Sequence, residues 1–268
     1  MIKKIIKKIP GTKSLNKLIL ERNIMKNFLV CSSLELKQVN FYEQFIKKND
    51  LVFDVGCNVG SRTKLFLNLG GKVVGFEPQE DLCNHLHGHL KRNRNFSLER
   101  TALGSKTGSA EINISDAHVL SSMSKRWIEA TQKSGRFDQY NWNKTDKVSV
   151  STLDEKIKTY GTPQFIKIDV EGYEFEVLKG LTRPINFISI EFTAEDLENS
   201  QKCIKLISNL GEYLFNYSIG ESLSFEERSW KTRDQIECLL RKQCLNDTRC
   251  WGDIYAKFVG AQESTLKT

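Results

Sequence analysis

Hydrophobic and polar positions along the chain repeat with two periods, and together they predict strands alternating with helices. Short apolar runs at residues 51–55, 72–76 and 164–169 predict buried strands. Amphipathic stretches such as residues 61–69 and 198–210 predict helices with one apolar face. Strands separated by helices are typical of a doubly wound, mostly parallel sheet, so the pattern predicts an α/β fold.

The same two periods predict elements over the rest of the chain. Further strands are predicted at residues 96–103, 109–114, 147–151, 185–192, 213–218 and 253–259. Further helices are predicted at residues 80–93, 152–159, 173–180 and 232–243. The polar stretch from Asp116 to Asp146 has the least regular pattern. It is compatible with a lid or substrate loop, and equally with an ordinary surface insertion.

Length and composition favour one domain with an extension. A chain of 268 residues with 39% hydrophobic content is large enough to bury a full core. We predict a basic, partly helical extension over residues 1–49 and one domain over residues 50–262. No apolar stretch approaches the roughly 20 residues of a membrane-spanning helix. Seven cysteines without CxxC spacing, and lysines that interrupt the first apolar segment, favour a cytoplasmic protein over an exported one.

The net charge of +7 is concentrated at one end of the chain. Residues 1–30 carry eight lysines and arginines and one glutamate, whereas the remainder carries 32 basic and 32 acidic residues. Isoleucines between the lysines could place this tail on the inner face of a membrane as a peripheral contact. The alternative is a solvated extension that is broken at Pro10-Gly11. The neutral body has no basic stripe typical of nucleic-acid binding, so we expect a small-molecule or glycan partner.

The turn after the first predicted strand, "DVGCNVG" at residues 54–60, indicates a cofactor site. In a doubly wound sheet, ligands bind at the carboxyl ends of the strands. A pyrophosphate-binding G-x-G-x-x-G motif would need glycine where Asn58 stands, so a dinucleotide is disfavoured. Gly56 and Gly60 allow close approach of an amino-acid moiety, and Asp54 could attract its ammonium group. These features favour S-adenosylmethionine.

The second predicted strand ends in "GFEP", where Glu77 lies 21 residues after Gly56. An acid at this position can accept hydrogen bonds from both hydroxyls of an unphosphorylated ribose. The turn and the acid together predict an adenosine site, although ribose contacts alone would also admit NAD.

Charged residues also follow the strand predicted in "FIKIDVEGYEFEVLKGL". Lys167, Asp169 and Glu171 alternate with apolar residues, so they should emerge on one side as the strand leaves the sheet beside the cofactor. Glu174 would lie in the first turn of the next helix, where the helix dipole favours an acid. The alternative interpretation is structural: helix capping, with Lys167 forming an ion pair with Asp169 or Glu171.

Five motifs in this order resemble the FkbM family of S-adenosylmethionine-dependent methyltransferases: "FDVGCNVG", "GFEP", "TALGS", "SVSTLDE" and "FIKIDVEGYEFEVLKG". The resemblance covers roughly residues 50–192. It implies a Rossmann-like seven-stranded methyltransferase sheet with a reversed final hairpin, and O-methylation of hydroxyl groups. It also implies site residues. The implied cofactor contacts are Asp54, Gly56, Asn58, Gly60 and Glu77, with Cys57 in place of the usual alanine, and the implied cluster beside the methyl group is Lys167, Asp169 and Glu171.

Two mechanisms follow from this cluster. Asp169 or Glu171 could act as a general base for an acceptor hydroxyl, with Lys167 steadying the carboxylate. Alternatively, Asp169, Glu171 and Glu191 could hold a divalent cation that acidifies the hydroxyl. We predict no other metal site, because His85 and His89 lack a third ligand nearby.

The sequence therefore predicts an O-methyltransferase that acts on a sugar, a glycan or another small hydroxylated molecule. One alternative is a nucleic-acid or other N-methyltransferase. It is disfavoured because "DVEG" stands where base N-methylating enzymes carry Asn or Asp followed by prolines and an aromatic residue. The other alternative is a noncatalytic module that keeps the fold and binds a membrane surface through the basic tail.

Overall fold

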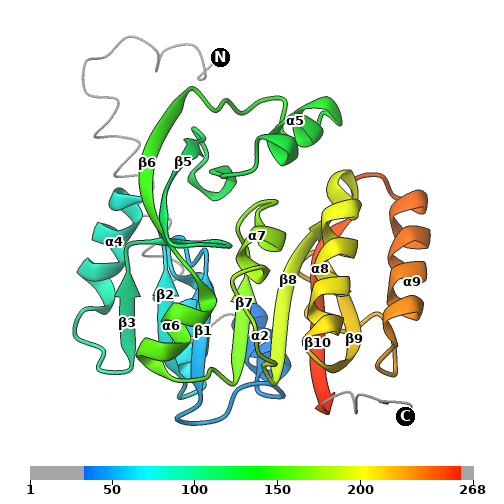
Figure 1. Cartoon of the computed structure of the whole chain (residues 1–268), viewed down its shortest axis with the longest axis horizontal. Coiled ribbons are helices and arrows are strands. Elements are labelled where there is room, and N and C mark those ends of the chain that lie inside the picture. Colours follow the sequence, from blue (N-terminus) through cyan, green and yellow to red (C-terminus); the bar gives the residue numbers. More distant parts are fainter. Residues whose placement is uncertain (1–32, 261–268) are drawn as a thin grey trace, which may run out of the picture. The chain divides into compact units, whose positions relative to one another are not determined.

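A computed structural model describes residues 33–260 of the chain. Within these residues, seven strands form one sheet in the order β3-β2-β1-β7-β8-β10-β9 (Figure 1). Strand β10 runs antiparallel to both β8 and β9, whereas β1, β2, β3, β7 and β8 are parallel. This order, with its reversed final hairpin, confirms the predicted α/β methyltransferase fold. The strands are β1 (Leu51–Val55), β2 (Lys72–Phe76), β3 (Phe96–Glu99), β7 (Phe165–Ile168), β8 (Phe187–Thr193), β9 (Glu212–Ile219) and β10 (Trp251–Gly260).

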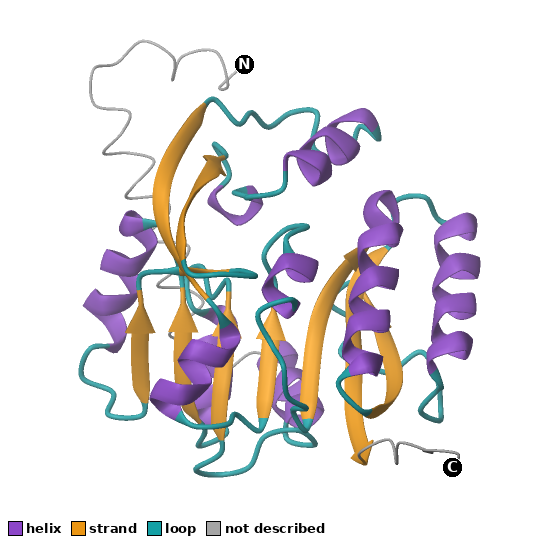
Figure 2. Ribbon diagram, viewed as in Figure 1, coloured by secondary structure: helices purple, strands orange, loops and turns teal. Residues whose placement is uncertain are grey.

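Helices cover both faces of this sheet (Figure 2). One face packs against four helices: α6 (Leu153–Tyr160), α7 (Glu174–Leu178), α8 (Leu197–Asn209) and α9 (Arg233–Asn246). The apolar stripe of α8, with Cys203, Ile204 and Ile207 fully buried, shows why the 3.6-residue period identified it. The other face packs against α3 (Ser61–Asn68), and α4 (Glu80–Leu90) lies beside β3.

Residues at and after the end of α2 (Ser33–Tyr42) complete the core on the α3 face. The ring of Phe45 stacks on those of Phe165 and Tyr255, with centroids 5.4 Å away in both cases. The last part of the predicted extension is thus packed on the sheet, and the domain boundary at residue 50 stays a prediction. The basic tail within residues 1–32 lies outside the described residues, and the membrane contact predicted for it stays a prediction. None of the described helices combines the length and apolar character needed to cross a membrane.

A second, three-stranded sheet follows the order β4-β6-β5, from β4 (Ala102–Leu103), β5 (Gly108–Ile114) and β6 (Lys144–Ser151). The prediction of one strand over residues 96–103 is therefore wrong. The chain leaves the large sheet at Glu99 and turns, with the Thr101 amide donating to the Glu99 carbonyl at 2.9 Å. The Thr101 hydroxyl then donates to the Ser149 carbonyl of β6 at 3.1 Å. Alternation along one strand cannot reveal which sheet each half joins.

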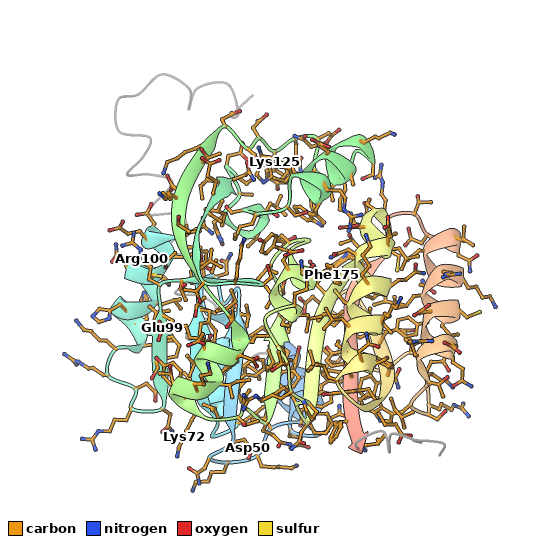
Figure 3. All side chains as sticks on the ribbon, viewed as in Figure 1. Asp50, Lys72, Glu99, Arg100, Lys125 and Phe175 are labelled. Atoms are coloured by element: carbon orange, nitrogen blue, oxygen red, sulfur yellow. The ribbon has the colours of Figure 1, made fainter. Side chains whose placement is uncertain are left out.

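The insertion, residues 116–146, connects β5 to β6 beyond the carboxyl ends of the parallel strands (Figure 1). It contains a short 3-10 helix, η2 (His118–Leu120), and a helix that we did not predict, α5 (Lys125–Lys133). Ser124 caps α5 by accepting a hydrogen bond from the Trp127 amide. Figure 3 shows Asp50 and Lys72 at the opposite, amino-terminal edge of the sheet, far from Lys125 of α5.

Candidate active site

The turn after β1 lies against both neighbouring strands. The amides of Gly56 and Cys57 both donate to the Phe76 carbonyl at the end of β2, at 3.0 and 3.1 Å. Gly56 has a φ of 81°, and a Cβ on it would overlap the carbonyl oxygen of Asp169, which follows β7. Only glycine therefore lets these two turns meet. The three strand ends form one site at the carboxyl edge of the sheet, where ligands of such sheets bind.

Glu77, at the end of β2, is held rigidly in this site. Its side chain is buried, with Oε2 accepting from the Asn58 amide at 3.0 Å and Oε1 from the Gln79 amide at 2.9 Å. Burial raises its pKa to about 7, although the two backbone hydrogen bonds oppose the shift. Each oxygen keeps a lone pair for another donor. This arrangement fits the two hydroxyls of an unphosphorylated ribose, and therefore the nucleoside part of S-adenosylmethionine.

The rest of the turn is fixed by packing. Asn58 adopts a positive φ of 50°, and its Nδ2 donates to the His118 carbonyl of the insertion at 3.4 Å. Cys57 is buried, and its Sγ lies against Gly75 of β2. Gly60, with a φ of 83°, precedes α3. The structure thus brings these predicted cofactor residues together, while their contact with the cofactor stays a prediction.

Asp54 is buried within β1 rather than displayed at its end. Its Oδ2 accepts a hydrogen bond of 2.5 Å from the Thr63 hydroxyl of α3. Burial raises its pKa to about 6, and the Thr63 hydrogen bond opposes the shift. The carboxylate therefore ties the turn to α3, and its predicted attraction for an ammonium group stays a prediction.

Lys167 of β7 lies inside the molecule, with only 1% of its side chain exposed. Its Nζ donates to Asp169 at 3.1 Å and to Asp253 of β10 at 2.8 Å. Burial alone would lower its pKa, but the charges of Asp169 and Asp253 outweigh burial and raise the pKa well above its usual value. The predicted ion pair between Lys167 and Asp169 is confirmed. Lys167 lies on the same side of the chain as Asp169, as the alternation predicts, but the expectation that it emerges from the sheet is wrong, because Asp253 of β10 compensates its charge inside the molecule.

The loop after β7 is bound on three sides. Glu174, at the start of α7 as predicted, accepts from the amides of Val170 and Gly172 at 3.2 and 3.1 Å. The other oxygen of Glu174 accepts from Nδ2 of Asn199 at 3.1 Å. Ser122 of the insertion donates to the Glu171 carbonyl at 2.6 Å. Glu171 itself has a φ of 55°, which is a strained conformation for a residue with a side chain.

Three carboxylates meet at the end of this loop. One oxygen each of Asp169, Glu171 and Glu191 lies within 4.8 Å of the others, and the three side chains are half-buried. Loss of water contact raises the pKa of Glu171 well above its usual value, and the charges of Asp169 and Glu174 add to the shift. The pKa of Glu191 rises for the same reasons, with Glu171 as its strongest charged neighbour. Glu171 and Glu191 therefore retain protons at a pH where isolated glutamates are charged.

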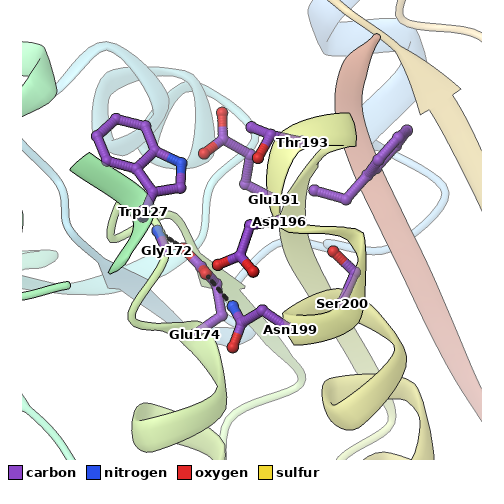
Figure 4. A pocket seen from close by; sticks show the side chains of 9 residues that line it. Trp127, Gly172, Glu174, Glu191, Thr193, Asp196, Asn199 and Ser200 are labelled. Atoms are coloured by element: carbon purple, nitrogen blue, oxygen red, sulfur yellow. Dashed lines mark hydrogen bonds between the residues drawn. The ribbon is translucent and has the colours of Figure 1, made fainter. Parts of the chain in front are cut away.

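A pocket adjoins the cluster between the insertion and the start of α8 (Figure 4). Glu191 and Gly172 both line it, and Glu191 also belongs to the carboxylate cluster. Gly172 has a φ of 87°, and a Cβ on it would overlap the side chain of Trp127. The lining residues are Trp127, Gly172, Glu174, Glu191, Phe192, Thr193, Asp196, Asn199 and Ser200.

Several residues of the site were not identified from the sequence. The sequence could have identified Asp253, because an acid at the start of the predicted buried strand "DIYAKFV" needs a buried partner. No sequence signal identifies the other three, Trp127, Asp196 and Asn199. They lie in an irregular stretch or on an amphipathic helix, and only the tertiary fold brings them to the site.

Comparison with known proteins identifies a family. Residues 54–236, more than half of the chain, match the model of the Methyltransferase FkbM domain. The chain is 28% identical to the 2-O-methyltransferase NoeI of Sinorhizobium fredii over 181 residues, which cover 61% of this chain and 72% of NoeI. It is 26% identical to the hexuronic acid methyltransferase AglP of Haloferax volcanii over 162 residues, which cover 55% of this chain and 58% of AglP.

Comparison with solved structures gives matches of low similarity. A TehB-like S-adenosylmethionine-dependent methyltransferase from Corynebacterium glutamicum is 10% identical, with a TM-score of 0.47 over 92% of this chain and 99% of that chain. The family match includes the turn 54–60, Glu77 and the loop that follows β7. The sequence resemblance is therefore confirmed on the residues that carried it. The chain belongs to the FkbM methyltransferase family and is an S-adenosylmethionine-dependent methyltransferase.

Proposed function

We propose that the enzyme transfers the methyl group to a hydroxyl of a sugar or glycan. The observation that carries the proposal is the position of the carboxylate cluster, which lies at the carboxyl ends of β7 and β8, next to the turn that fits the nucleoside. A hydroxyl is a poor nucleophile at neutral pH and needs a base within hydrogen-bond reach. The names of the two relatives, a 2-O-methyltransferase and a hexuronic acid methyltransferase, support an oxygen acceptor and a sugar.

Different residues of the site would bind the cofactor and remove the proton of the acceptor. Glu77 and the turn 56–60 would bind the nucleoside, with Asp54 holding the turn in place. When bound, S-adenosylmethionine would supply a methyl group on a positively charged sulfur, so that attack by an acceptor oxygen on the methyl carbon breaks the carbon–sulfur bond and the sulfur leaves as a neutral thioether. Glu171 would take the proton of the acceptor hydroxyl as the oxygen attacks. Lys167 would act through Asp169 as a positioning residue, because its amine is buried.

A base such as Glu171 contributes on the order of a hundredfold to the rate. Its raised pKa helps, because a stronger base accepts the hydroxyl proton more readily once the carboxylate is ionised. Glu191 and Asp169 lie close enough to share the proton afterwards. Release of the proton from this half-buried cluster to water would then return the base to its ionised state for the next turnover.

A divalent cation is the second way to use the same three carboxylates. Carboxylate oxygens are the ligands that magnesium and calcium prefer, and a bound cation would acidify the hydroxyl directly. Lys167 argues against this alternative, because its ammonium group already compensates Asp169 at 3.1 Å. We therefore propose the general-base route, and the two routes differ in their response to a chelator.

The test is transfer of a labelled methyl group to a panel of methyl glycosides of hexoses and hexuronic acids, followed by mass spectrometry of the products. We expect an ether at one ring hydroxyl, formed at the same rate with EDTA and with added magnesium. Methyl esters of the hexuronic acids without ethers would contradict the hydroxyl acceptor. Loss of activity in EDTA, restored by magnesium, would contradict the general-base route.

A further inference from the structure

The pocket beside the carboxylate cluster holds two buried polar atoms without partners. Within residues 33–260, no hydrogen-bond partner is found for Nε1 of Trp127 or Oδ2 of Asp196. The two side chains are 1% and 6% exposed, so water outside the molecule does not satisfy these atoms. Both residues line the same pocket (Figure 4). Unpaired buried polar atoms are rare in folded proteins, and two in one pocket indicate a ligand group that pairs with both.

The chemistry of the two atoms defines that group. The indole nitrogen of Trp127 can only donate, and a carboxylate oxygen of Asp196 can only accept. Arg126 pairs with the other oxygen of Asp196 at 2.5 Å and so holds the carboxylate in place. A hydroxyl both accepts and donates, so its chemistry complements both atoms. The pocket has room for about one water-sized group, which matches a single hydroxyl rather than a carboxylate or a ring.

The place of the pocket defines what else the ligand carries. Glu191 belongs both to the pocket and to the carboxylate cluster, and Gly172 of the pocket follows Glu171 directly. A group in the pocket and a group at the cluster are therefore neighbours. We propose that the pocket binds a second hydroxyl of the acceptor, adjacent to the one that is methylated, so that the acceptor is a vicinal diol such as two neighbouring ring positions of a sugar. This inference rests on the proposed function and extends it from a hydroxyl to a diol.

The test compares acceptors that differ by one hydroxyl. The panel glycoside that is methylated best is paired with its deoxy analogue at each position next to the methylated oxygen, and kcat/KM is measured for both. The wild-type enzyme should prefer the diol by about 10- to 100-fold, because the deoxy analogue leaves both buried atoms unpaired. Trp127→Phe removes the donor together with part of the ring system and keeps an aromatic ring at this position, so the preference should fall to about threefold or less.

The insertion offers a matched control. Nε1 of Trp142 donates to the Leu120 carbonyl at 2.7 Å, so Trp142→Phe removes an indole donor from the same segment but outside the pocket. This variant should keep the wild-type preference. Asp196→Ala provides a second route if Trp127→Phe folds poorly, and the affinity for S-adenosylmethionine and the Tm of each variant report whether the fold is intact.

The outcomes separate the two proposals. A wild-type enzyme that methylates the diol and the deoxy analogue equally well would show that the pocket holds only water. A preference that survives both Trp127→Phe and Asp196→Ala, or that falls as much in Trp142→Phe, would also overturn the diol subsite while leaving sugar methylation standing. Binding of S-adenosylmethionine without methylation of any glycoside would instead refute the proposed function, and the subsite with it.

Discussion

The two halves of the site are built in different ways. The cofactor half uses residues 54–77, which form one strand-turn-helix-strand unit, and the contact between Asn58 and Glu77 stays within it. The acceptor half draws on β7, β8, β10, α8 and the insertion, so its contacts join residues far apart along the chain. Most contacts of the local unit join residues close together in the sequence, whereas the assembled half depends on contacts across the whole fold. We therefore expect substitutions in each half to affect donor binding and methyl transfer separately.

The largest effect should come from Gly56→Ala, because Gly56 lies where the two halves meet. The added methyl group would overlap the Asp169 carbonyl at a φ that also disfavours alanine. The free energy of unfolding should fall by about 4 kcal/mol, as measured by urea denaturation, and donor binding and transfer should both be lost. Gly88→Ala is the control, because a Cβ there meets no atom within 4 Å, and it should be neutral or stabilising. Equal effects in the two variants would contradict this account.

Lys167→Met should come next and should affect the acceptor half. It leaves Asp253 buried without its cation, which costs about 3 kcal/mol of stability in chemical denaturation. The double variant Lys167→Met with Asp253→Asn should recover part of this loss, because the uncompensated charge is gone. No recovery in the double variant would mean that the lysine acts through packing instead.

Glu171→Gln should reduce methyl transfer by about a hundredfold and leave the Kd for S-adenosylmethionine unchanged. In the wild type, kcat/KM should rise with pH as the cluster ionises, and its midpoint should lie above the usual range for glutamate because the pKa of Glu171 is raised. Glu176→Gln is a matched control on α7, where the carboxylate pairs with Lys179 at the surface. If Glu171→Gln raised the Kd for S-adenosylmethionine as much as a cofactor-half variant does, the two halves would not act separately on donor binding and methyl transfer.

The smallest effect should come from Glu77→Gln, which should weaken donor binding about tenfold in calorimetry and spare the acceptor half. In the folded protein the pKa of Glu77 is about 7 rather than its usual 4.5, so the folded state holds this proton more tightly. The stability gained is full below about pH 4.5 and is lost as the pH rises to about 7. The fall in Tm over this range should be shallower in Glu77→Gln. An identical slope in both proteins would show that Glu77 is not the group responsible.

The contrast between the halves also explains what the sequence could predict. The turn 54–60 and Glu77 were identified because a strand period, two glycines and a fixed spacing lie within one short segment. The strands and helices of the large sheet followed from periodicity, and apart from the split strand their ends differ from the predicted bounds by at most three residues. The number of strands in the sheet and its reversed final hairpin came from the family resemblance.

The acceptor half was predictable only in part. Asp169, Glu171 and Glu191 stand at predicted strand ends, so their meeting followed from the topology. The burial of Lys167 did not, because its partner Asp253 lies 86 residues away. Helix α5 was missed since its sequence "KRWIEATQK" is short and mostly polar, and its three buried residues gain their partners only in the folded insertion.

The positive φ of Glu171 has a consequence for how this enzyme could change over time. A residue with a side chain is strained in that conformation, and here a carboxylate is also crowded by two others. Glycine at this position would remove both the backbone strain and the crowding of the carboxylates, so selection for stability alone would replace the glutamate. A glutamate that is kept at this position would then mean that the protein has lower stability than it could have, in exchange for catalytic activity. A Glu171→Gly variant that is more stable than the wild type but has lost methyl transfer would demonstrate this exchange of stability for activity.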